Sequence, residues 1–432
     1  MPQRTTRLLV TLGLCLLLTP VSMAQELLVA PDNALGIYQP GQTIRWKVHV
    51  KGADVPEAAF TLKTGGLTEL TKGKVALADG QGQIEAKLDT PGWLLVDVSI
   101  KPATNKRVTA LGGALVLPEK IQPALPRPDE FDTFWEGKLK ELAAVPMNTK
   151  LAPADSGKAN VDYFKITMDN IRGSRIRGQL GRPKQGEKFP AMLIVQWAGV
   201  YPLQKGWVTD RAAEGWLTLN INAHDLPIDE PQQFYNEQTA GPLKDYTGIG
   251  NDDRETSYFL RMYLSCYRAA QYLTERDDWD GRTLVVTGGS QGGLQSIVTA
   301  GLHPKITAVL ACVPAGCDLN GPVAGRLPGW PMWYWKTQGR DEAKVRHAAG
   351  YYDVVNFTSR VKCPVLIGVG LIDTVCPPSG VYAAYNQLPG PKEIVVLPFG
   401  EHGEKKGSHG PYYARFNAWK QALVQGNAAP VK

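Results

Sequence analysis

Four glycines flank a single serine in the stretch Val286-Thr-Gly-Gly-Ser-Gln-Gly-Gly-Leu294. Glycine loses more conformational freedom on folding than other residues, so this cluster indicates a backbone path that side chains would obstruct. The apolar run before it, residues 283–287, is typical of a buried strand, and residues 294–302 are typical of a helix. Gly-x-Ser-x-Gly between a strand and a helix predicts a nucleophile elbow, a sharp turn that exposes Ser290. The helix behind it would offer the N–H group of Gln291 to an oxyanion.

Short apolar runs recur along the second half of the chain. They are bounded by turn residues and separated by segments of helix length, which is typical of parallel strands buried on both faces. The runs cover residues 191–196, 216–221, 283–287, 308–313, 364–369 and 393–397. We therefore expect an α/β fold with a mostly parallel, doubly wound sheet. Together with the elbow at Ser290, the pattern predicts the α/β-hydrolase fold.

The N-terminal part of the chain has a different pattern. Apolar and polar residues alternate over residues 43–50, as in a strand with one buried face, and further strands are expected at 83–88 and 93–100. These short strands and their turns predict a small all-β, immunoglobulin-like sandwich domain over residues 25–118. The proline-rich stretch that follows predicts a linker over residues 119–128.

A helix is expected directly after this linker. Over residues 129–142 the large apolar side chains fall on one stripe, acids come early and lysines come late, as the helix dipole favours. We expect this helix to open the catalytic domain, residues 129–432.

The first 24 residues have the composition of a secretory signal peptide. Arg4 and Arg7 precede an apolar run that ends at Leu18, and Ser22-Met-Ala24 offers small residues for cleavage. The run is too short to span a bilayer, which needs about 20 residues, so we expect no membrane anchor. The expected location is secreted or periplasmic, with a mature chain that begins at Gln25.

Charge and cysteine content exclude several classes of partner. The net charge is +6, and no long basic run is present, so nucleic acid is not an expected partner. Removal of the signal peptide leaves five cysteines, so at least one must be free or pair between chains. Their spacing matches no zinc motif and the six histidines form no His-Glu-x-x-His pair, so we expect neither a metal nor a cofactor.

A serine nucleophile needs an acid and a base, which follow the serine in this order in α/β-hydrolases. Asp373 follows the apolar run 364–369, and His402 follows the run 393–397. Both lie where a parallel sheet gathers catalytic groups, after the carboxyl end of a strand. His409 competes for the role of the base, and we favour His402 because it follows its strand more closely.

These residues resemble the acetyl xylan esterase and cephalosporin-C deacetylase family of carbohydrate esterases. The resemblance covers about residues 126–420. It is carried by the segments Arg127-Pro-Asp-Glu-Phe-Asp-Thr-Phe-Trp135, Gly288-Gly-Ser-Gln-Gly-Gly293, Tyr352-Asp-Val-Val-Asn-Phe357 and Gly370-Leu-Ile-Asp-Thr-Val-Cys-Pro-Pro378.

The resemblance implies a role for each of these residues. Ser290 is the implied nucleophile, Asp373 the acid and His402 the base. The implied oxyanion hole consists of backbone N–H groups of Gln291 and of the loop 199–201, where the second donor is Val200 or Tyr201. Family members often form ring-shaped hexamers, so the resemblance implies a possible homo-oligomer, which the added N-terminal sandwich would obstruct if it lies in the contact region.

The pocket around these residues departs from the family pattern. Asn222-Ala-His-Asp225 stands where the family carries Arg-Gly-Gln, and Trp197-Ala-Gly-Val-Tyr201 replaces its His-Gly-Tyr. Aromatic rings can stack on sugar rings, so we expect Trp197, Trp330 and Trp333 to bind substrate, against the alternative that they pack in the core or an interface.

We expect a secreted serine esterase that removes acetyl groups from xylan, xylo-oligosaccharides or related small acetyl esters. One alternative is a secreted peptidase of the prolyl-oligopeptidase type. Such enzymes carry a much larger β domain than the roughly 95 residues before the linker can build, since each propeller blade needs about 40. The other alternative is a non-catalytic carbohydrate-binding protein with a hydrolase fold.

Overall fold

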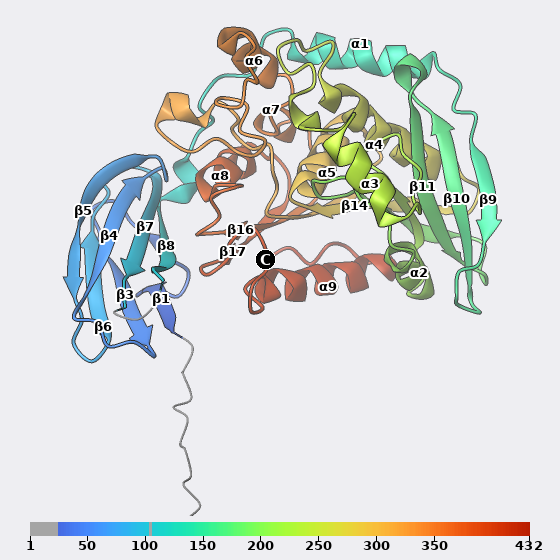
Figure 1. Ribbon diagram of the computed structural model, residues 1–432. Coiled ribbons are helices and arrows are strands. Elements are labelled where there is room, and N and C mark those ends of the chain that lie inside the picture. Colours follow the sequence, from blue (N-terminus) through green and yellow to red (C-terminus); the bar gives the residue numbers. More distant parts are fainter. Residues whose placement is uncertain (1–24, 103–105) are drawn as a thin grey trace, which may run out of the picture.

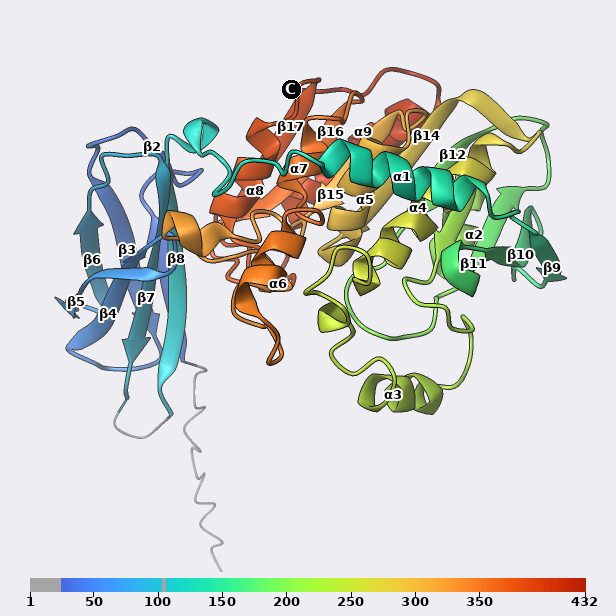
Figure 2. The same cartoon turned by 90° about the horizontal axis from the view of Figure 1, so that it is seen from above.

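The computed structural model describes residues 25–102 and 106–432 (Figure 1). The expected signal peptide, residues 1–24, lies outside these described residues. An all-β part formed by the N-terminal strands lies beside a larger part that contains both helices and strands (Figures 1 and 2). None of the helices in the described ranges is long and apolar enough to cross a membrane.

The N-terminal part is a sandwich of two sheets with the strand orders β1-β3-β6 and β2-β8-β7-β4-β5. Trp46 and Ile84 of one sheet share a buried apolar cluster with Leu94 and Val96 of the other. All three strands expected here are present, as β3, β6 and β7. The strands are β1 (Glu26–Pro31), β2 (Ile37–Tyr38), β3 (Ile44–Lys51), β4 (Glu57–Thr64), β5 (Thr68–Ala76), β6 (Gln81–Ala86), β7 (Gly92–Ile100) and β8 (Val108–Val116).

The larger part is built on a nine-stranded sheet with the order β17-β16-β15-β14-β12-β13-β11-β10-β9. The strands from β13 to β17 in this order are parallel, whereas β11, β10 and β9 pair antiparallel at one edge. The strands are β9 (Lys150–Ala154), β10 (Val161–Asp169), β11 (Arg175–Pro183), β12 (Phe189–Ile194), β13 (Leu217–Ile221), β14 (Trp279–Gly289), β15 (Ala308–Cys312), β16 (Val365–Gly370) and β17 (Lys392–Leu397).

Helices cover both faces of this sheet (Figure 1). Helix α9 packs Trp419 and Tyr412 against apolar residues of one face, the face on which α2 also lies. Helices α4, α5 and α8 bury the other face, and α1 packs its Trp135 on Tyr263 of α4 as an outer layer. The helices are α1 (Phe131–Ala143), α2 (Gly206–Ala213), α3 (Gln232–Ala240), α4 (Tyr258–Thr274), α5 (Gln291–Leu302), α6 (Glu342–Ala349), α7 (Val355–Thr358), α8 (Pro378–Asn386) and α9 (Gly410–Val424).

The expected fold class is confirmed. Each of the six apolar runs forms a strand of the parallel region, and the helix expected over residues 129–142 is α1. The antiparallel strands β9, β10 and β11 were not predicted. They have exposed or mixed faces, so they lack the continuous apolar runs that mark the buried parallel strands.

Candidate active site

Ser290 occupies a strained turn between β14 and α5. Its backbone has φ 54° and ψ −120°, a conformation that residues with a side chain rarely adopt. A Cβ atom at Gly288 would lie 2.6 Å from the backbone of Gly292, and one at Gly292 would lie 2.6 Å from the carbonyl oxygen of Val195. The glycines therefore let three backbone segments meet around the serine, which is the geometry of a nucleophile elbow.

The imidazole of His402 lies against the Ser290 hydroxyl. Ser290 Oγ and His402 Nε2 are 2.9 Å apart, within hydrogen-bond distance. His402 is in the loop after β17, and its side chain is 26% exposed. The pair therefore stands at the carboxyl edge of the sheet, where solvent and a substrate can reach it.

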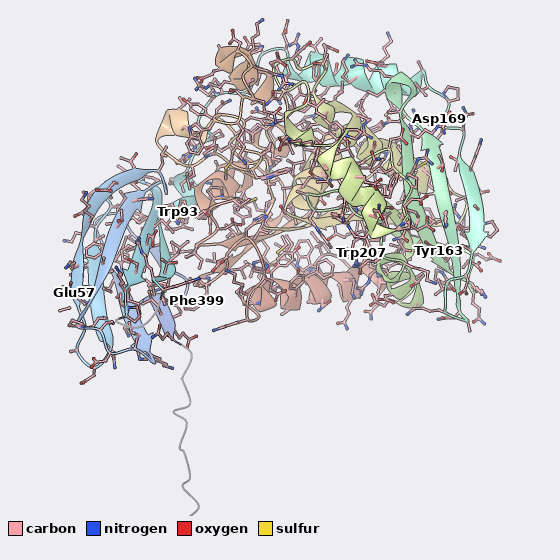
Figure 3. All side chains as sticks on the ribbon, viewed as in Figure 1. Glu57, Trp93, Tyr163, Asp169, Trp207 and Phe399 are labelled. Carbon is pink, nitrogen blue, oxygen red and sulfur yellow. The ribbon has the colours of Figure 1, made fainter. Side chains whose placement is uncertain are left out.

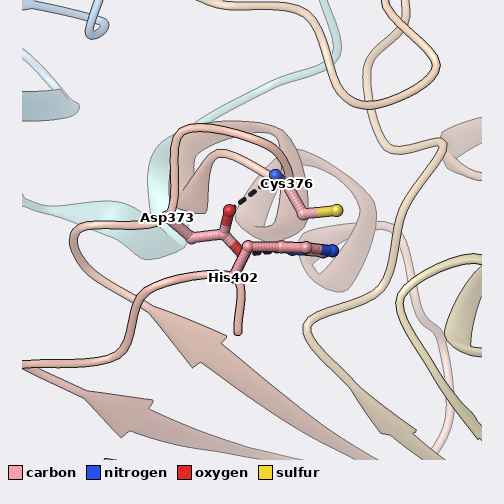
Figure 4. Close-up of side chains that lie close together, drawn as sticks. All are labelled: Asp373, Cys376 and His402. Carbon is pink, nitrogen blue, oxygen red and sulfur yellow. Dashed lines mark hydrogen bonds and ion pairs between the residues drawn. The ribbon is translucent and has the colours of Figure 1, made fainter. Parts of the chain in front are cut away.

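Asp373 holds the other side of this imidazole. Its Oδ2 lies 3.0 Å from His402 Nδ1, and its side chain is fully buried (Figure 4). Its Oδ1 accepts hydrogen bonds from the backbone N–H groups of Val375 and Cys376, both at 2.8 Å. Because an ionised carboxylate can only accept, Nδ1 carries the proton and Nε2 is left to accept from the serine hydroxyl.

Cys376 lies next to Asp373 and His402. The potential ligand atoms of Asp373, Cys376 and His402 lie within 4.8 Å of one another (Figure 4). Burial and the neighbouring carboxylate raise the pKa of the Cys376 thiol, so it stays protonated at neutral pH. All five cysteines among the described residues are unpaired.

The competing histidine is placed elsewhere. His409 is 3% exposed at the start of α9, and its Nε2 lies 2.9 Å from the carbonyl oxygen of Glu401. Its Nδ1 faces Cys312 Sγ at 3.9 Å. Of the two histidines after β17, it is His402 that the fold brings to Ser290.

Gln291, the expected oxyanion donor, is the first residue of α5. An N–H group at this position has no carbonyl to bind within its own helix, so it is free to donate to a ligand. The Gln291 side chain is fully buried, and its Oε1 accepts a hydrogen bond of 2.5 Å from the hydroxyl of Tyr246. The same hydroxyl accepts a bond of 3.4 Å from the Gly199 N–H group, which joins Gln291 to the loop 199–201.

His224 contacts the loop 199–201 through the backbone of Gly199. Sequence reasoning assigned no role to this residue. Its Nε2 lies 3.1 Å from the Gly199 carbonyl oxygen, and its Nδ1 lies 2.6 Å from the Tyr258 hydroxyl. A carbonyl can only accept, so Nε2 carries the proton and Nδ1 accepts from Tyr258. Burial lowers the pKa of His224 to about 4, so the ring is neutral at pH 7. The segment Asn222-Ala-His-Asp225, which departs from the family pattern, was the only sequence signal for this residue.

Tyr201 and Val200 lie on the same loop. The Tyr201 hydroxyl donates to the carbonyl oxygen of Trp197 at 2.9 Å, and the two rings stack with centroids 5.2 Å apart. Val200 is buried. Both remain candidates for the second oxyanion donor.

The three tryptophans expected to bind substrate differ in their exposure to solvent. Trp197 is 48% exposed although its ring stacks on Tyr201 and meets Trp207 edge-on, and it lines the same cavity as Gly288 and Gly289 of the elbow. Trp330 is partly buried, stacks on Phe259, and donates its backbone N–H group to Val375 in the loop that carries Asp373. Trp333 is only 1% exposed and donates its indole N–H group to the Thr247 carbonyl, so it is a core residue without a face for a ligand.

A cavity of about 410 Å³ lies behind the elbow, between the sheet and helices α2 and α9. Trp197 lines it together with Trp207, Tyr413 and Phe416, and Gly288 and Gly289 form part of its wall. Ser290 is not among its lining residues. The cavity therefore lies beside the elbow, and the Ser290 side chain does not line it.

Comparisons with known proteins show the family to which this chain is similar. The sequence profile of the acetyl xylan esterase (AXE1) family matches residues 117–421. The acetyl esterase Axe7A of Xylanibacter ruminicola is 34% identical over 385 residues, which are 87% of this chain and 86% of that protein.

Solved structures show the same fold. An acetyl xylan esterase from Paenibacillus sp. R4 aligns with a TM-score of 0.60 and 25% identity, over 69% of this chain and 97% of its own. Acetyl xylan esterase 1 from Thermoanaerobacterium sp. JW/SL YS485 also aligns with a TM-score of 0.60, at 24% identity, over 69% of this chain and 96% of its own.

Proposed function

The chain belongs to the acetyl xylan esterase family, and from this membership we propose that it removes acetyl groups from xylan or xylo-oligosaccharides with Ser290, His402 and Asp373 as its catalytic triad. The observation that carries the proposal is the hydrogen-bonded series from the Ser290 hydroxyl through the His402 imidazole to the buried Asp373 carboxylate. This series is centred on a serine held in a strained elbow.

In the proposed first step, Ser290 Oγ attacks the acetyl carbonyl carbon while His402 Nε2 takes the hydroxyl proton. The charge that develops on the carbonyl oxygen is stabilised by the N–H group of Gln291 and by that of Val200 or Tyr201. His402 then gives its proton to the departing sugar oxygen, and the acetyl group remains on the serine. Water, deprotonated by the same imidazole, releases acetate in the second step and restores the serine.

Asp373 serves this cycle without transferring a proton. Its Oδ2 fixes the imidazole in the tautomer whose Nε2 can accept, and its charge stabilises the imidazolium that forms in each step. The two backbone N–H groups on Oδ1 hold the carboxylate in one orientation. Preorganisation of this kind leaves little rearrangement to be made during the reaction.

The sugar-binding proposal centres on Trp197. Its half-exposed ring stacks on Tyr201 of the loop 199–201, which holds the proposed second oxyanion donor, so a sugar that carries the reacting acetyl group can stack on its exposed side. Trp330 is a second proposed contact through its partly buried ring. The similarity to an acetyl esterase and an acetyl xylan esterase supports this class of substrate.

We further propose that the protein is exported and that the mature chain begins at Gln25. The composition of residues 1–24 supports this proposal. We propose the division expected from the sequence, with a sandwich domain over 25–118, a linker over 119–128 and a catalytic domain over 129–432.

The proposed function is tested by acetate release from a panel of acetylated xylo-oligosaccharides. The wild-type enzyme should release acetate, and Ser290→Ala should not, while both should show the same circular dichroism. A serine-directed fluorophosphonate should label the wild-type enzyme at one site per chain and leave Ser290→Ala unlabelled. Cleavage of prolyl peptides without acetate release would contradict the proposal and favour a peptidase.

A further inference from the structure

Strand β7 of the N-terminal sandwich is buried on both faces. Leu94 and Val96 point into the sandwich, whereas Trp93 and Leu95 belong to the apolar core of the α/β part. Successive side chains of a strand point to opposite faces, so β7 contributes side chains to two apolar cores. Trp93 lies on the side of the sandwich that faces the rest of the chain (Figure 3).

The contact on that side is made with the loop that carries the catalytic acid. The indole N–H group of Trp93 donates a buried hydrogen bond of 2.9 Å to the carbonyl oxygen of Leu371, two residues before Asp373. Leu371 is fully buried. A backbone carbonyl buried in this way needs a partner, and the sandwich supplies it.

Strand β8 touches the same peptide group with its backbone. A Cβ atom at Gly113 would overlap the Leu371 carbonyl oxygen and lie 2.6 Å from the Leu371 carbonyl carbon. The neighbouring Gly112 faces the opposite way, since its Cβ would meet Val29 and Trp46 inside the sandwich. Glycine at position 113 is therefore required for the close approach between the two parts.

The acid loop, residues 371–376, also contacts the loop that carries His402, on the side away from the sandwich. The Leu371 N–H group donates to the Leu397 carbonyl at 3.0 Å, and the Ile372 N–H group donates to the Gly400 carbonyl at 3.2 Å. Gly400 stands two residues before His402. Residues 371–373 are thus held between the sandwich and the His402 loop, and a shift of Leu371 would change the geometry between Asp373 and His402.

A second contact ties the sandwich to the same loop through one intermediate segment. The Leu327 N–H group donates to the Gly65 carbonyl in the β4–β5 turn at 2.8 Å, and three residues later Trp330 donates to Val375 at 2.9 Å. Val375 is one of the two residues whose N–H groups bind Asp373 Oδ1. Both ends of the acid loop are therefore fixed with reference to the sandwich.

We infer that Trp93 and Gly113 are positioning residues for the catalytic acid, and that the N-terminal sandwich is a structural part of the active site. The inference rests on the proposed function because it assigns Asp373 as the acid. The sandwich acts through Leu371 on the orientation of the Asp373 carboxylate, and through it on His402. A detachable carbohydrate-binding module would need no such contact with the acid loop.

The test uses the full-length chain and a matched pair of variants. Gly113→Ala places a methyl group against Leu371, whereas Gly112→Ala places the same group inside the sandwich. Trp93→Phe keeps an aromatic ring and removes the donor to Leu371 together with one ring of the indole, and it serves in case Gly113→Ala does not fold. Kinetics on a small acetyl ester are normalised to the sites labelled by a fluorophosphonate, so that only folded enzyme is counted.

Gly113→Ala and Trp93→Phe should lower kcat by on the order of tenfold to 100-fold with KM little changed, because small misplacements of catalytic groups have effects of this size. Gly112→Ala should keep the wild-type kcat per labelled site. Equal kcat losses in the Gly112 and Gly113 variants, or unchanged kcat in both Gly113→Ala and Trp93→Phe, would overturn the inference.

A second readout needs no substrate. The low-field proton resonance of His402 Nδ1–H reports its hydrogen bond to Asp373, and it should shift or broaden in Gly113→Ala and Trp93→Phe but not in Gly112→Ala. If the wild-type enzyme released no acetate from any ester, the proposed function would fail while this resonance still tested the positioning. An unchanged resonance in both Gly113→Ala and Trp93→Phe would refute the positioning inference and leave the proposed function standing.

Discussion

His409 donates a hydrogen bond from Nε2 to the carbonyl oxygen of Glu401, the residue directly before His402. The two histidines after β17 therefore have different tasks. His402 faces Ser290. His409 binds the loop that contains His402 to the start of α9.

This relationship predicts different outcomes for two alanine variants. His402→Ala should lower kcat by on the order of 10⁴- to 10⁶-fold, because the serine loses its base. His409→Ala should retain most of the activity and lose some thermal stability, since only a loop contact is removed. Steady-state kinetics with a small acetyl ester distinguish the two. An inactive His409→Ala beside an active His402→Ala would reverse the assignment of the base.

Removal of two members of the proposed triad together should add little to the effect of removing either one. Ser290→Ala with His402→Ala is expected to be about as slow as Ser290→Ala alone, because the two groups act as a unit. Rates of the single and double variants give the comparison. Multiplicative losses would mean that His402 acts independently of Ser290.

The network behind the oxyanion loop predicts a loss of rate when its donor is removed. His224→Leu should lower kcat by on the order of tenfold to 100-fold, because the Gly199 carbonyl loses its partner and the loop can shift. His224→Gln offers an amide N–H group in place of Nε2–H, so it should recover much of the activity. If both variants matched the wild type in kcat, the network would have no part in catalysis.

His224 also predicts a change in the pH dependence of stability. Folding lowers its pKa from 6.5 to about 4, so the unfolded chain binds the proton more readily. The resulting stabilisation is fully present above pH 6.5 and is lost as the pH falls toward 4, by on the order of 2–3 kcal/mol.

Urea unfolding at several pH values can isolate this contribution. Relative to the wild type, His224→Gln should show a smaller fall in the free energy of unfolding between pH 6.5 and pH 4. Other titrating groups are common to both proteins and cancel in the difference. Parallel curves for the two proteins would contradict the predicted neutral, buried imidazole.

The exposed ring of Trp197 predicts an effect that depends on the size of the substrate. Trp197→Ala should raise KM for acetylated xylo-oligosaccharides by about threefold to tenfold, the usual range for one lost ring contact. The KM for a small acetyl ester without a sugar should change little. Trp333→Phe is a suitable control, because Trp333 is buried away from ligands. Equal increases in KM for both substrates would exclude a sugar platform at Trp197.

Sequence patterns predicted the parallel sheet because its strands are buried on both faces and so carry uninterrupted apolar runs. They also placed Ser290, Asp373 and His402 at strand ends, which a parallel sheet gathers at one edge. The antiparallel strands β9–β11 were missed because partly exposed strands have no such runs.

Contacts between distant segments were beyond prediction from the sequence. The Trp93–Leu371 hydrogen bond joins residues 278 positions apart, and no local pattern encodes it. The continuous apolar run in β7 did hold a signal, since a strand with one solvent-facing side would alternate instead. For Trp333 the sequence could not distinguish a core tryptophan from a surface one, because both occur in loops rich in aromatic residues.

The backbone conformation of Ser290, which the proposed catalysis needs, destabilises the folded protein. Glycine adopts a φ of 54° freely, whereas serine does not. The strained conformation destabilises the folded protein by about 1–3 kcal/mol. Ser290→Gly should therefore yield an inactive protein that melts at a higher temperature than the wild type. Selection for thermal stability alone would favour glycine at this position, and in the proposed function selection for turnover retains the serine.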